Sequence, residues 1–217
     1  MTQADERLRI TEIFFSLQGE TSRVGLPTTF IRLTGCPLRC AWCDTAYAFG
    51  GGEWKTIDAI LDATRRFPTR YVTVTGGEPL AQRGCLGLLT ALCNAGFDVS
   101  LETSGALDVS RVDGRVSRIV DLKAPASGES ARNLWSNLAL LRARDEIKIV
   151  VADRADYEWA RQTFRERGLD QICPVLLAPV AGSIEPRTLA EWILEDGLPV
   201  RMQLQLHKLL WQDARGR

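Results

Sequence analysis

Short β-rich segments alternate with amphipathic helical segments along almost the whole chain, and this alternation constrains the fold more than any other feature. Apolar and β-branched residues predict strands at 9–15, 28–34, 71–75, 98–103, 117–122, 146–151, 174–178 and 200–206. The helical period predicts helices at 56–66, 83–95, 130–142, 154–167 and 186–195. Because strands separated by helices assemble into parallel sheets, the sequence predicts an α/β fold whose sheet is open or partly closed.

The size and charge of the chain favour one domain and argue against two classes of partner. Its 217 residues are 45% hydrophobic, which is enough for a large buried core, and they contain no repeat, linker or low-complexity tract. We therefore expect a single domain over 1–217. The 27 basic and 27 acidic side chains cancel. General binding to nucleic acids or membrane surfaces needs a basic excess, so neither partner is expected.

The N-terminal segment MTQADERLRI mixes charges and lacks the apolar stretch of a signal peptide. No apolar run approaches the roughly 18–20 residues that a membrane-spanning helix needs. The predicted location is the cytoplasm. In that reducing compartment, clustered cysteines more often hold metal or do redox work than form disulfides.

Polar and glycine-rich loops follow four of the predicted strands at their carboxyl ends. They read GCPLRC after 28–34, GGEP after 71–75, SG after 98–103 and KAP after 117–122. In parallel α/β folds such loops meet at one rim of the sheet, where ligands bind. Any one of these glycines could serve only a turn. The four loops together predict a site on this rim.

Three cysteines lie close together in the segment GCPLRCAWCDT (35–45). Cys36, Cys40 and Cys43 follow the pattern C-x3-C-x2-C. Thiolates this close repel one another unless a cation compensates them, and a metal ion or an iron–sulfur cluster supplies that cation. The other cysteines, Cys85, Cys93 and Cys173, stand among apolar neighbours, where we predict small buried hydrophobic side chains.

The number of clustered cysteines separates the alternatives. Buried structural thiols are disfavoured because a proline, an arginine and a glycine crowd this loop. Structural zinc normally takes four protein ligands, and the sole histidine, His207, is far away in sequence. A zinc-stabilised binding module without chemistry is the alternative from another class. Three thiolates suit a [4Fe–4S] cluster that leaves one iron open for a ligand that is not protein.

The C-x3-C-x2-C motif followed by GGEP resembles the radical S-adenosylmethionine superfamily. That resemblance implies a [4Fe–4S] cluster whose open iron is chelated by S-adenosylmethionine. It also implies reductive cleavage of this cofactor to a 5′-deoxyadenosyl radical, which abstracts hydrogen, and an external electron donor. A glycyl-radical activating enzyme shares the cysteine motif in a compact chain and is the nearest alternative within the superfamily.

Further segments resemble one family of this superfamily, 7-carboxy-7-deazaguanine synthase of queuosine and deazapurine biosynthesis. They are FSLQGE (15–20), FIRLTGCPLRCAWCDT (30–45), VTGGEPL (74–80), LETSG (101–105) and QLHK (205–208), in the family's order. The resemblance implies an abridged, partial (β/α) barrel, a homodimer and bound Mg²⁺. The implied reaction is ring contraction of the small-molecule substrate 6-carboxy-5,6,7,8-tetrahydropterin to 7-carboxy-7-deazaguanine, a carbon–nitrogen lyase reaction that releases ammonia.

Matching position by position, the family resemblance assigns roles to individual side chains. Cys36, Cys40 and Cys43 would hold the cluster, and Thr45 would bind magnesium. The S-adenosylmethionine contacts would be Trp42, Cys43, Asp44, Gly77, Glu78, Asp121, Leu122 and Lys123. The substrate contacts would be Leu17, Gln18, Gly19, Glu20, Arg32, Thr75, Glu102 and His207. No side chain is assigned a catalytic role beyond the cluster and the cofactor.

The chemistry of several of these side chains suits the role. The Glu20 carboxylate can accept parallel hydrogen bonds from the adjacent N–H groups of an aminopyrimidine edge. Arg32 can pair with the substrate carboxylate in a fork geometry. Glu78 can accept from the cofactor ammonium. Glu102 ends a strand and fits a second polar anchor, since a buried carboxylate is costly without a partner.

The chain departs from the family pattern in places. Where many members have Ser-Pro-Lys, it has Asp121-Leu122-Lys123, which puts the details of cofactor contact there in question. The segment APVAG near Pro179 is less polar than the family pattern. The tail LLWQDARGR continues past His207, so a role for a terminal carboxylate is not carried over.

Overall fold

The computed structural model describes residues 7–212 and 214–216. The predicted domain 1–217 and the N-terminal and C-terminal segments discussed above therefore include positions outside the described residues, namely 1–6, 213 and 217. In chain order the strands are β1 (Arg7–Leu17), β2 (Pro27–Leu33), β3 (Glu53–Thr56), β4 (Tyr71–Gly76), β5 (Asp98–Thr103), β6 (Ser117–Lys123), β7 (Glu146–Val151), β8 (Val175–Pro179) and β9 (Arg201–Met202). Seven of the eight predicted strands are confirmed to within about two residues at either end.

The described strands form one nine-stranded sheet in the order β3-β1-β2-β4-β5-β6-β7-β8-β9. From β2 to β9 every neighbouring pair is parallel. β1 runs antiparallel to both β2 and β3. The predicted α/β fold with a partly closed sheet is confirmed, with the correction that an antiparallel edge, including the unpredicted β3, precedes the parallel part.

The α-helices are α1 (Ile57–Arg65), α2 (Cys85–Asn94), α3 (Arg154–Arg167), α4 (Pro186–Asp196) and α5 (Leu206–Trp211). Their ends follow local chemistry. Thr56 caps α1 by accepting from the Ala59 N–H at 3.2 Å, and Asp153 caps α3 by accepting from the Asp156 N–H at 2.9 Å. Gly168 ends α3 in the left-handed conformation, at φ 55°. None of the helices within residues 7–212 and 214–216 has the length and apolar character needed to cross a membrane.

Two predicted elements are wrong. The segment 130–142 contains only the short 3₁₀ turns Ser130–Arg132 and Trp135–Leu140. Asn133 and Asn137 explain this, because their side chains bond to backbone groups outside the segment. The Asn133 amide exchanges two hydrogen bonds with Lys123, and Asn137 bonds to the backbone of Gly105, Leu107 and Val109. The predicted strand 200–206 is confined to β9, and α5 begins at Leu206.

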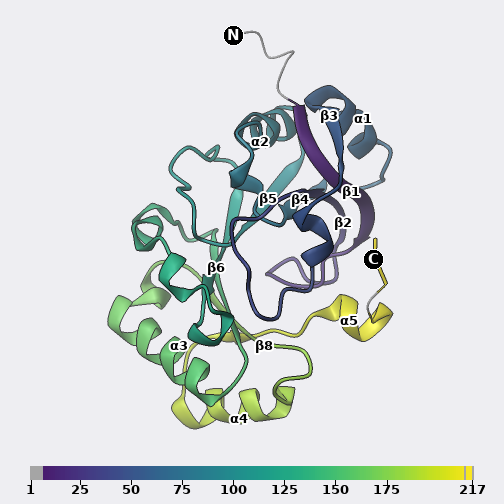
Figure 1. Cartoon of the computed structure of the whole chain (residues 1–217). Helices are drawn as coiled ribbons and strands as arrows, with labels where there is room; N and C mark the ends of the chain where they lie inside the picture. The colour runs from purple at the N-terminus through teal and green to yellow at the C-terminus, as the bar shows by residue number, and fades with distance from the viewer. Residues whose placement is uncertain (1–6, 213, 217) are drawn as a thin grey trace.

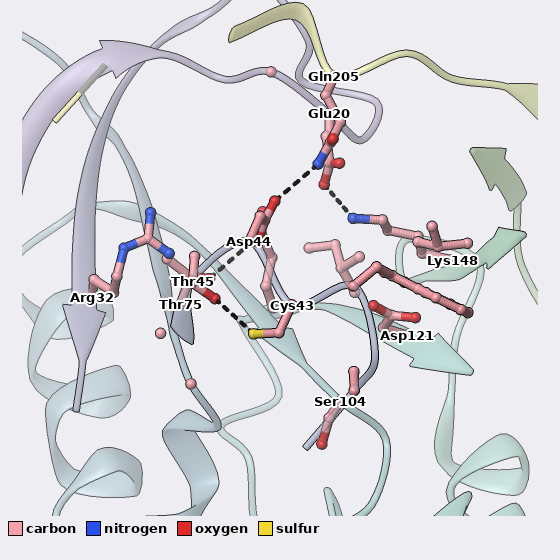
Figure 2. A pocket seen from close by; sticks show the side chains of 18 of the residues that line it. Glu20, Arg32, Cys43, Asp44, Thr45, Thr75, Ser104, Asp121, Lys148 and Gln205 are labelled. Atoms are coloured by element: carbon pink, nitrogen blue, oxygen red, sulfur yellow. Dashed lines mark hydrogen bonds and ion pairs between the residues drawn. The ribbon is translucent and has the colours of Figure 1, made fainter. Parts of the chain in front are cut away.

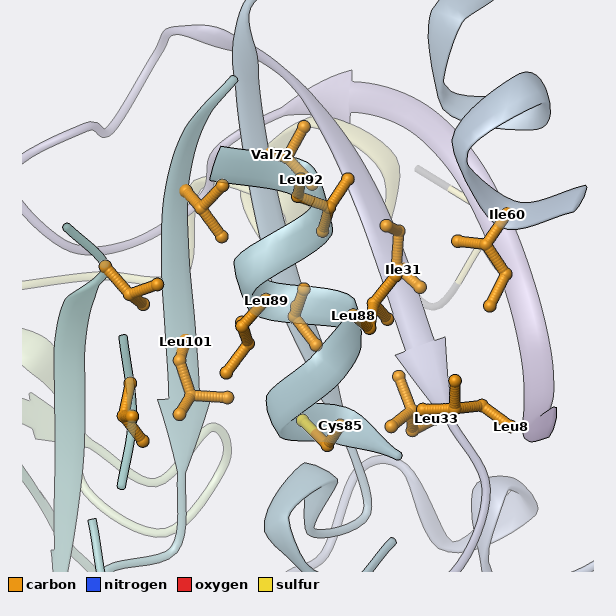
Figure 3. Packing of buried hydrophobic residues seen from close by; sticks show 14 of the residues in the cluster. Leu8, Ile31, Leu33, Ile60, Val72, Cys85, Leu88, Leu89, Leu92 and Leu101 are labelled. Atoms are coloured by element: carbon orange, nitrogen blue, oxygen red, sulfur yellow. The ribbon is translucent and has the colours of Figure 1, made fainter. Parts of the chain in front are cut away.

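α1 to α4 cover one face of the sheet, whereas α5 lies beside the cavity (Figure 1). Strand alternation sends every second side chain of the sheet to the face opposite α1 to α4. Figure 3 shows Cys85, Leu88, Leu89 and Leu92, at positions i, i+3, i+4 and i+7 on α2, packed toward the strands. Burying each such leucine contributes about 1.5–3 kcal/mol. Two of the three cysteines predicted to be buried are confirmed: Cys85 lies in this core, and Cys173 lies in a second core beneath α3 and α4. The third, Cys93, is only partly buried.

Polar contacts bridge the open side of the sheet. The turn after β1 reaches the segment after β9, where the Thr21 N–H donates to Gln203 Oε1 (2.7 Å) and Gln203 Nε2 donates to the Thr21 carbonyl (2.9 Å). The Leu206 N–H donates to the Gly19 carbonyl (3.0 Å). These bonds join the turn after β1 to the segment between β9 and α5.

Candidate active site

The cysteine loop follows β2 and lies at the carboxyl end of the parallel strands. Cys36, Cys40 and Cys43 are each partly exposed and line one cavity of about 310 Å³. The loop is held by its backbone: the Cys43 N–H donates to the Cys40 carbonyl (3.2 Å), and the Ala41 N–H donates to the Ser127 carbonyl (3.0 Å). Partial burial raises the pKa of the Cys36 and Cys40 thiols, so a bound cation is needed to keep them as thiolates near neutral pH.

The glycines of GGEP allow the loop after β4 to approach the cysteine loop. A Cβ on Gly77 would stand 2.3 Å from the Gly35 carbonyl oxygen and 2.8 Å from Cys36 Cβ. The Gly77 N–H donates to the Leu33 carbonyl (3.2 Å), and the Glu78 N–H donates to the Gly35 carbonyl (2.8 Å). Because no side chain fits between the loops, glycine at 77 sets the position of the cysteine loop.

Seventeen of the nineteen predicted site residues line the same cavity. They are Leu17, Gln18, Gly19, Glu20, Arg32, Cys36, Cys40, Trp42, Cys43, Asp44, Thr45, Thr75, Gly77, Glu102, Asp121, Lys123 and His207. These residues come from β1, β2, β4, β5, β6, α5 and the loops between them. Figure 2 shows ten of the residues that line this cavity with labels, converging from several strands.

The structure does not bring Glu78 and Leu122 into the cavity lining. The Glu78 carboxylate is fully buried and accepts hydrogen bonds from Thr103 Oγ1 (2.9 Å), Ser104 Oγ (2.5 Å) and the backbone N–H groups of Ser104 (2.7 Å) and Leu80 (2.9 Å). It joins the ends of β4 and β5. Leu122 is 1% exposed in the core beneath the helices, because strand alternation turns it away from Asp121 and Lys123. Their contacts with a cofactor stay predictions.

Arg32 lies on β2, and only the Nε of its guanidinium group donates a hydrogen bond among the described residues. Its Nε donates to Glu12 Oε1 at 2.7 Å, and the Tyr47 hydroxyl donates to the same oxygen at 2.8 Å. The two terminal nitrogens of Arg32 have no hydrogen-bond partner within residues 7–212 and 214–216. They form the fork that can hold a carboxylate. Burial, opposed by Arg32, raises the pKa of Tyr47 to about 12, so its hydroxyl remains a donor to Glu12.

Glu102 on β5 is held by neutral donors. Gln18 Nε2 donates to one oxygen (3.3 Å), and Thr75 Oγ1 donates to the other (2.9 Å). Gln18 also donates to Thr73 Oγ1 (3.2 Å), which fixes the turn after β1 against the sheet. Burial, followed by the negative charge of Glu20, raises the pKa of the Glu102 carboxyl.

Glu20 contacts Lys148, a cavity residue that the sequence analysis missed. Lys148 lies on β7, and its ammonium donates to Glu20 Oε2. Burial raises the pKa of Glu20, but the Lys148 charge and hydrogen bond outweigh it and bring the pKa below its ordinary value. A signal for Lys148 exists in the sequence, since it is the only charged residue inside the apolar run IKIVV (147–151). Such a residue in a central strand needs a partner.

The remaining charged side chains border the cavity in pairs. Lys123 Nζ donates to Asp121 Oδ2 at 2.8 Å. Asp44 accepts from Gln205 Nε2 at 3.4 Å, and the Lys208 ammonium stands 3.7 Å from it. Gln205 and Lys208 line the cavity and were not assigned roles from the sequence, although the QLHK segment contains both.

His207 packs directly on Gly19. A Cβ at Gly19 would stand 2.3 Å from His207 Nδ1, so only glycine leaves room for the ring. Burial lowers the pKa of His207, while the negative charges of Glu20 and Asp44 act against that shift. A neutral imidazole offers the cavity both a donor and an acceptor nitrogen.

The donor set fits the cluster and cofactor that the sequence predicted. Among the described residues, no group of three or more His, Cys, Asp or Glu side chains is placed to hold a single metal ion. A [4Fe–4S] cluster takes one thiolate per iron, so its cysteines need not converge on one point. Two buried carboxylate oxygens in the cavity wall, Glu20 Oε1 and Asp121 Oδ1, have no hydrogen-bond partner among the described residues, which suits ligands with N–H donors.

Thr45 lines the cavity with its hydroxyl 3.7 Å from Cys43 Sγ. A hydroxyl is a weak ligand by itself, so substrate oxygens and water would have to complete the octahedron of a magnesium ion. Magnesium at Thr45 stays a prediction.

Comparison with known proteins places the chain in a family. The sequence model of the Radical SAM superfamily matches residues 30–125. The chain is 51% identical to 7-carboxy-7-deazaguanine synthase from Chlorobaculum tepidum, over 96% of this chain and 97% of that protein. It is 43% identical to the enzyme of the same name from Koribacter versatilis, over 94% and 97% of the two chains.

Solved structures agree with this placement. The crystal structure of QueE from Escherichia coli matches with a TM-score of 0.78 and 28% identity, over 94% of this chain and 96% of that chain. SuiB from Streptococcus suis bound to S-adenosylmethionine matches at a TM-score of 0.57 with 15% identity, which shows a shared fold only. The identity with the two curated relatives is high and almost full-length. This chain therefore belongs to the 7-carboxy-7-deazaguanine synthase family of the radical S-adenosylmethionine superfamily.

Proposed function

We propose that this chain is a radical S-adenosylmethionine enzyme that converts 6-carboxy-5,6,7,8-tetrahydropterin to 7-carboxy-7-deazaguanine with loss of ammonia. The observation that carries this proposal is that one cavity is lined both by the three clustered cysteines and by polar side chains suited to a carboxypterin. A cluster loop alone would fit any member of the superfamily. The charged wall opposite it is what favours this substrate.

The cavity offers complementary groups for each part of the pterin. The free terminal nitrogens of Arg32 would take the substrate carboxylate as a fork, while Glu12 fixes the rest of the guanidinium. Glu20 Oε1 would accept from the N–H edge of the aminopyrimidine ring. Glu102, held by Gln18 and Thr75, would provide a second anchor on the same ring.

Cys36, Cys40 and Cys43 would hold the cluster. Trp42, Gly77 and Asp121, which line the same cavity, would border the S-adenosylmethionine. When bound, these cofactors would provide the radical chemistry that removes a hydrogen atom from the substrate carbon that bears the carboxylate. The protein orients the ring and excludes water around it. Gln205, His207 and Lys208 would cover the substrate from the chain's end, since all three line the cavity.

Three further features belong to this proposal. The enzyme would use magnesium at Thr45 and an external electron donor, as the family resemblance implies. It would act as a homodimer built from a single domain. Its site would be the cytoplasm, where a reducing environment keeps the cluster's cysteines from forming disulfides.

Anaerobic reconstitution tests the proposed function. The purified chain should turn brown, bind iron and sulfide, and form 7-carboxy-7-deazaguanine and ammonia from the tetrahydropterin, as followed by mass spectrometry. A brown protein that forms no deazapurine would refute the proposed substrate and leave the superfamily assignment intact. A glycyl-radical activating enzyme would give this result. A colourless protein with stoichiometric zinc would refute the cluster.

A further inference from the structure

A buried ion pair crosses the wall of the cavity between residues that are distant in sequence. Lys148 on β7 donates to Glu20 Oε2 in the turn after β1. The side chains are 14% and 9% exposed, respectively. A buried pair of this kind costs desolvation that good geometry only partly repays, so it is weak evidence for a role in stability. Its place in the cavity lining indicates a role toward the ligand.

The pair uses only part of the Glu20 carboxylate. Oε1 is buried and has no hydrogen-bond partner within the described part of the chain. The Glu20 backbone is fixed from the other side, because its N–H donates to Gln18 Oε1 at 3.2 Å. An unpaired buried acceptor costs about 1–3 kcal/mol unless a ligand supplies a donor. The free oxygen thus points to a ligand with an N–H group.

Glu102 provides a contrast within the same cavity. Both of its oxygens accept from neutral donors, and no cation within residues 7–212 and 214–216 forms an ion pair with it. Burial and the Glu20 charge raise the pKa of Glu102, whereas Lys148 brings that of Glu20 down. The charge of Lys148 lowers the pKa of both carboxylates, but the hydrogen bond from its ammonium goes to Glu20. The other charged groups that face this pair are Asp44, Asp121, Arg32, Lys123 and His207.

We propose that Lys148 is a positioning and specificity-determining residue that holds the Glu20 carboxylate so that its free oxygen receives an N–H of the 2-amino group on the pterin's aminopyrimidine edge. This inference rests on the function proposed above. Lys148 acts through Glu20, since the hydrogen bond that its ammonium donates among the described residues goes to Glu20 Oε2. A site built around a charged acceptor rejects analogues that lack the matching donor, because the acceptor is then left unpaired.

Equilibrium binding of 6-carboxypterin tests this role apart from catalysis. This air-stable, fluorescent compound keeps the aminopyrimidine edge and the carboxylate of the substrate. Lys148→Met should weaken the binding of 6-carboxypterin about tenfold to hundredfold, because the ligand N–H then loses its hydrogen bond to a charged, correctly placed Glu20 carboxylate. Lys148→Arg should recover most of the affinity, because the cation is restored. Each variant is first checked by its thermal unfolding curve.

A double-mutant cycle separates positioning from direct contact. Glu20→Gln should weaken binding of 6-carboxypterin, and adding Lys148→Met to it should weaken binding no further. Additive losses would mean that Lys148 touches the ligand itself, which would overturn the positioning role. The analogue without the 2-amino group, 4-oxopteridine-6-carboxylate, should bind weakly and almost equally to the wild type and to Lys148→Met. If Lys148→Met lowers its affinity as much as that of 6-carboxypterin, the specificity role is refuted.

Arg118 provides the matched control. It forms a buried ion pair with Asp145, 8% and 0% exposed, outside the cavity lining. Arg118→Met should lower the melting temperature and leave the affinity for 6-carboxypterin unchanged. If wild-type enzyme forms no product from the tetrahydropterin, the proposed function fails. If it forms product and Lys148→Met binds 6-carboxypterin like the wild type, only the role of Lys148 fails.

Discussion

At one end of the cavity the cysteine loop rests on Gly77 through backbone contacts, whereas at the other end charged side chains from separate strands contact one another. The loop end tolerates no added Cβ, since the space between Gly77 and the Gly35 carbonyl is already filled. The charged end depends on pairs such as Arg32–Glu12 and Lys148–Glu20. The first end should therefore respond to changes of shape, and the second to changes of charge.

The largest effect is expected from removing a cluster ligand. Cys40→Ala should abolish the brown colour and all turnover, because two thiolates cannot hold a cluster whose fourth iron must stay open. Iron content, visible absorbance and product formation measure this directly. Cys93→Ala on α2, outside the cavity lining, is the control and should keep iron and turnover. If Cys40→Ala and Cys93→Ala bind equal amounts of iron, the cysteine loop does not hold the cluster.

A single methyl group should disturb the loop end almost as strongly. Gly77→Ala places Cβ against the Gly35 carbonyl and Cys36 Cβ, so one loop must move. Such overpacking costs about 1–3 kcal/mol of folding free energy and shifts the thiols. The measurements are the melting temperature and the iron bound per chain after reconstitution.

Gly50→Ala is the control for that change, since a Cβ at Gly50 meets nothing within 4 Å. It should leave both the melting temperature and the iron content close to those of the wild type. If Gly77→Ala also binds a full complement of iron, backbone contact between the loops does not position the cysteines.

At the charged end, the geometry of a cation should matter as well as its charge. Arg32→Lys keeps the charge but loses the planar fork, and it also breaks the Nε bond to Glu12. Loss of hydrogen bonds to a charged group costs about 1.5–3 kcal/mol, so kcat/KM should fall about tenfold to hundredfold, chiefly through KM. Steady-state kinetics at several substrate concentrations measure the split. An unchanged KM would exclude Arg32 from the substrate carboxylate.

The two ends also differ in how far they could be predicted from sequence. The cysteine loop and GGEP are contiguous motifs, and their backbone contacts follow from residues that are neighbours on adjacent strands. Period-two alternation also predicts which strand residues face the cavity, as for Thr75 and Glu102. Applied to Asp121-Leu122-Lys123, the same rule places Leu122 in the core, where the structure has it.

The pairing of charges could not be predicted in the same way. Lys148 and Glu20 are 128 positions apart, and only the assembled sheet brings them together. The missing helix at 130–142 has a similar cause, because Asn133 and Asn137 bond to backbone that is distant in sequence. Local propensity favours a helix there, and these tertiary hydrogen bonds outweigh it.

The smallest effects concern the opposite behaviour of the two carboxylates with pH. Burial, followed by the Glu20 charge, raises the pKa of Glu102. The unfolded chain ionises at the ordinary pKa, so the stability from neutral Glu102 is present below that pH and is lost as the pH rises toward the folded pKa. Relative to the wild type, Glu102→Gln should therefore gain stability as the pH rises from about 4 to about 7.

Glu20→Gln should show the reverse slope. The Lys148 charge, acting against burial, lowers the pKa of Glu20, so the stability from ionised Glu20 is present above the ordinary pKa and is lost as the pH falls toward the folded pKa. This variant should lose stability relative to the wild type as the pH rises through the acidic range to the ordinary pKa of 4.5, and the difference should stay constant above it. Urea unfolding of both variants at each pH measures the two slopes. If both variants change in the same direction relative to the wild type as the pH rises, the pKa values of Glu102 and Glu20 are not shifted in opposite directions.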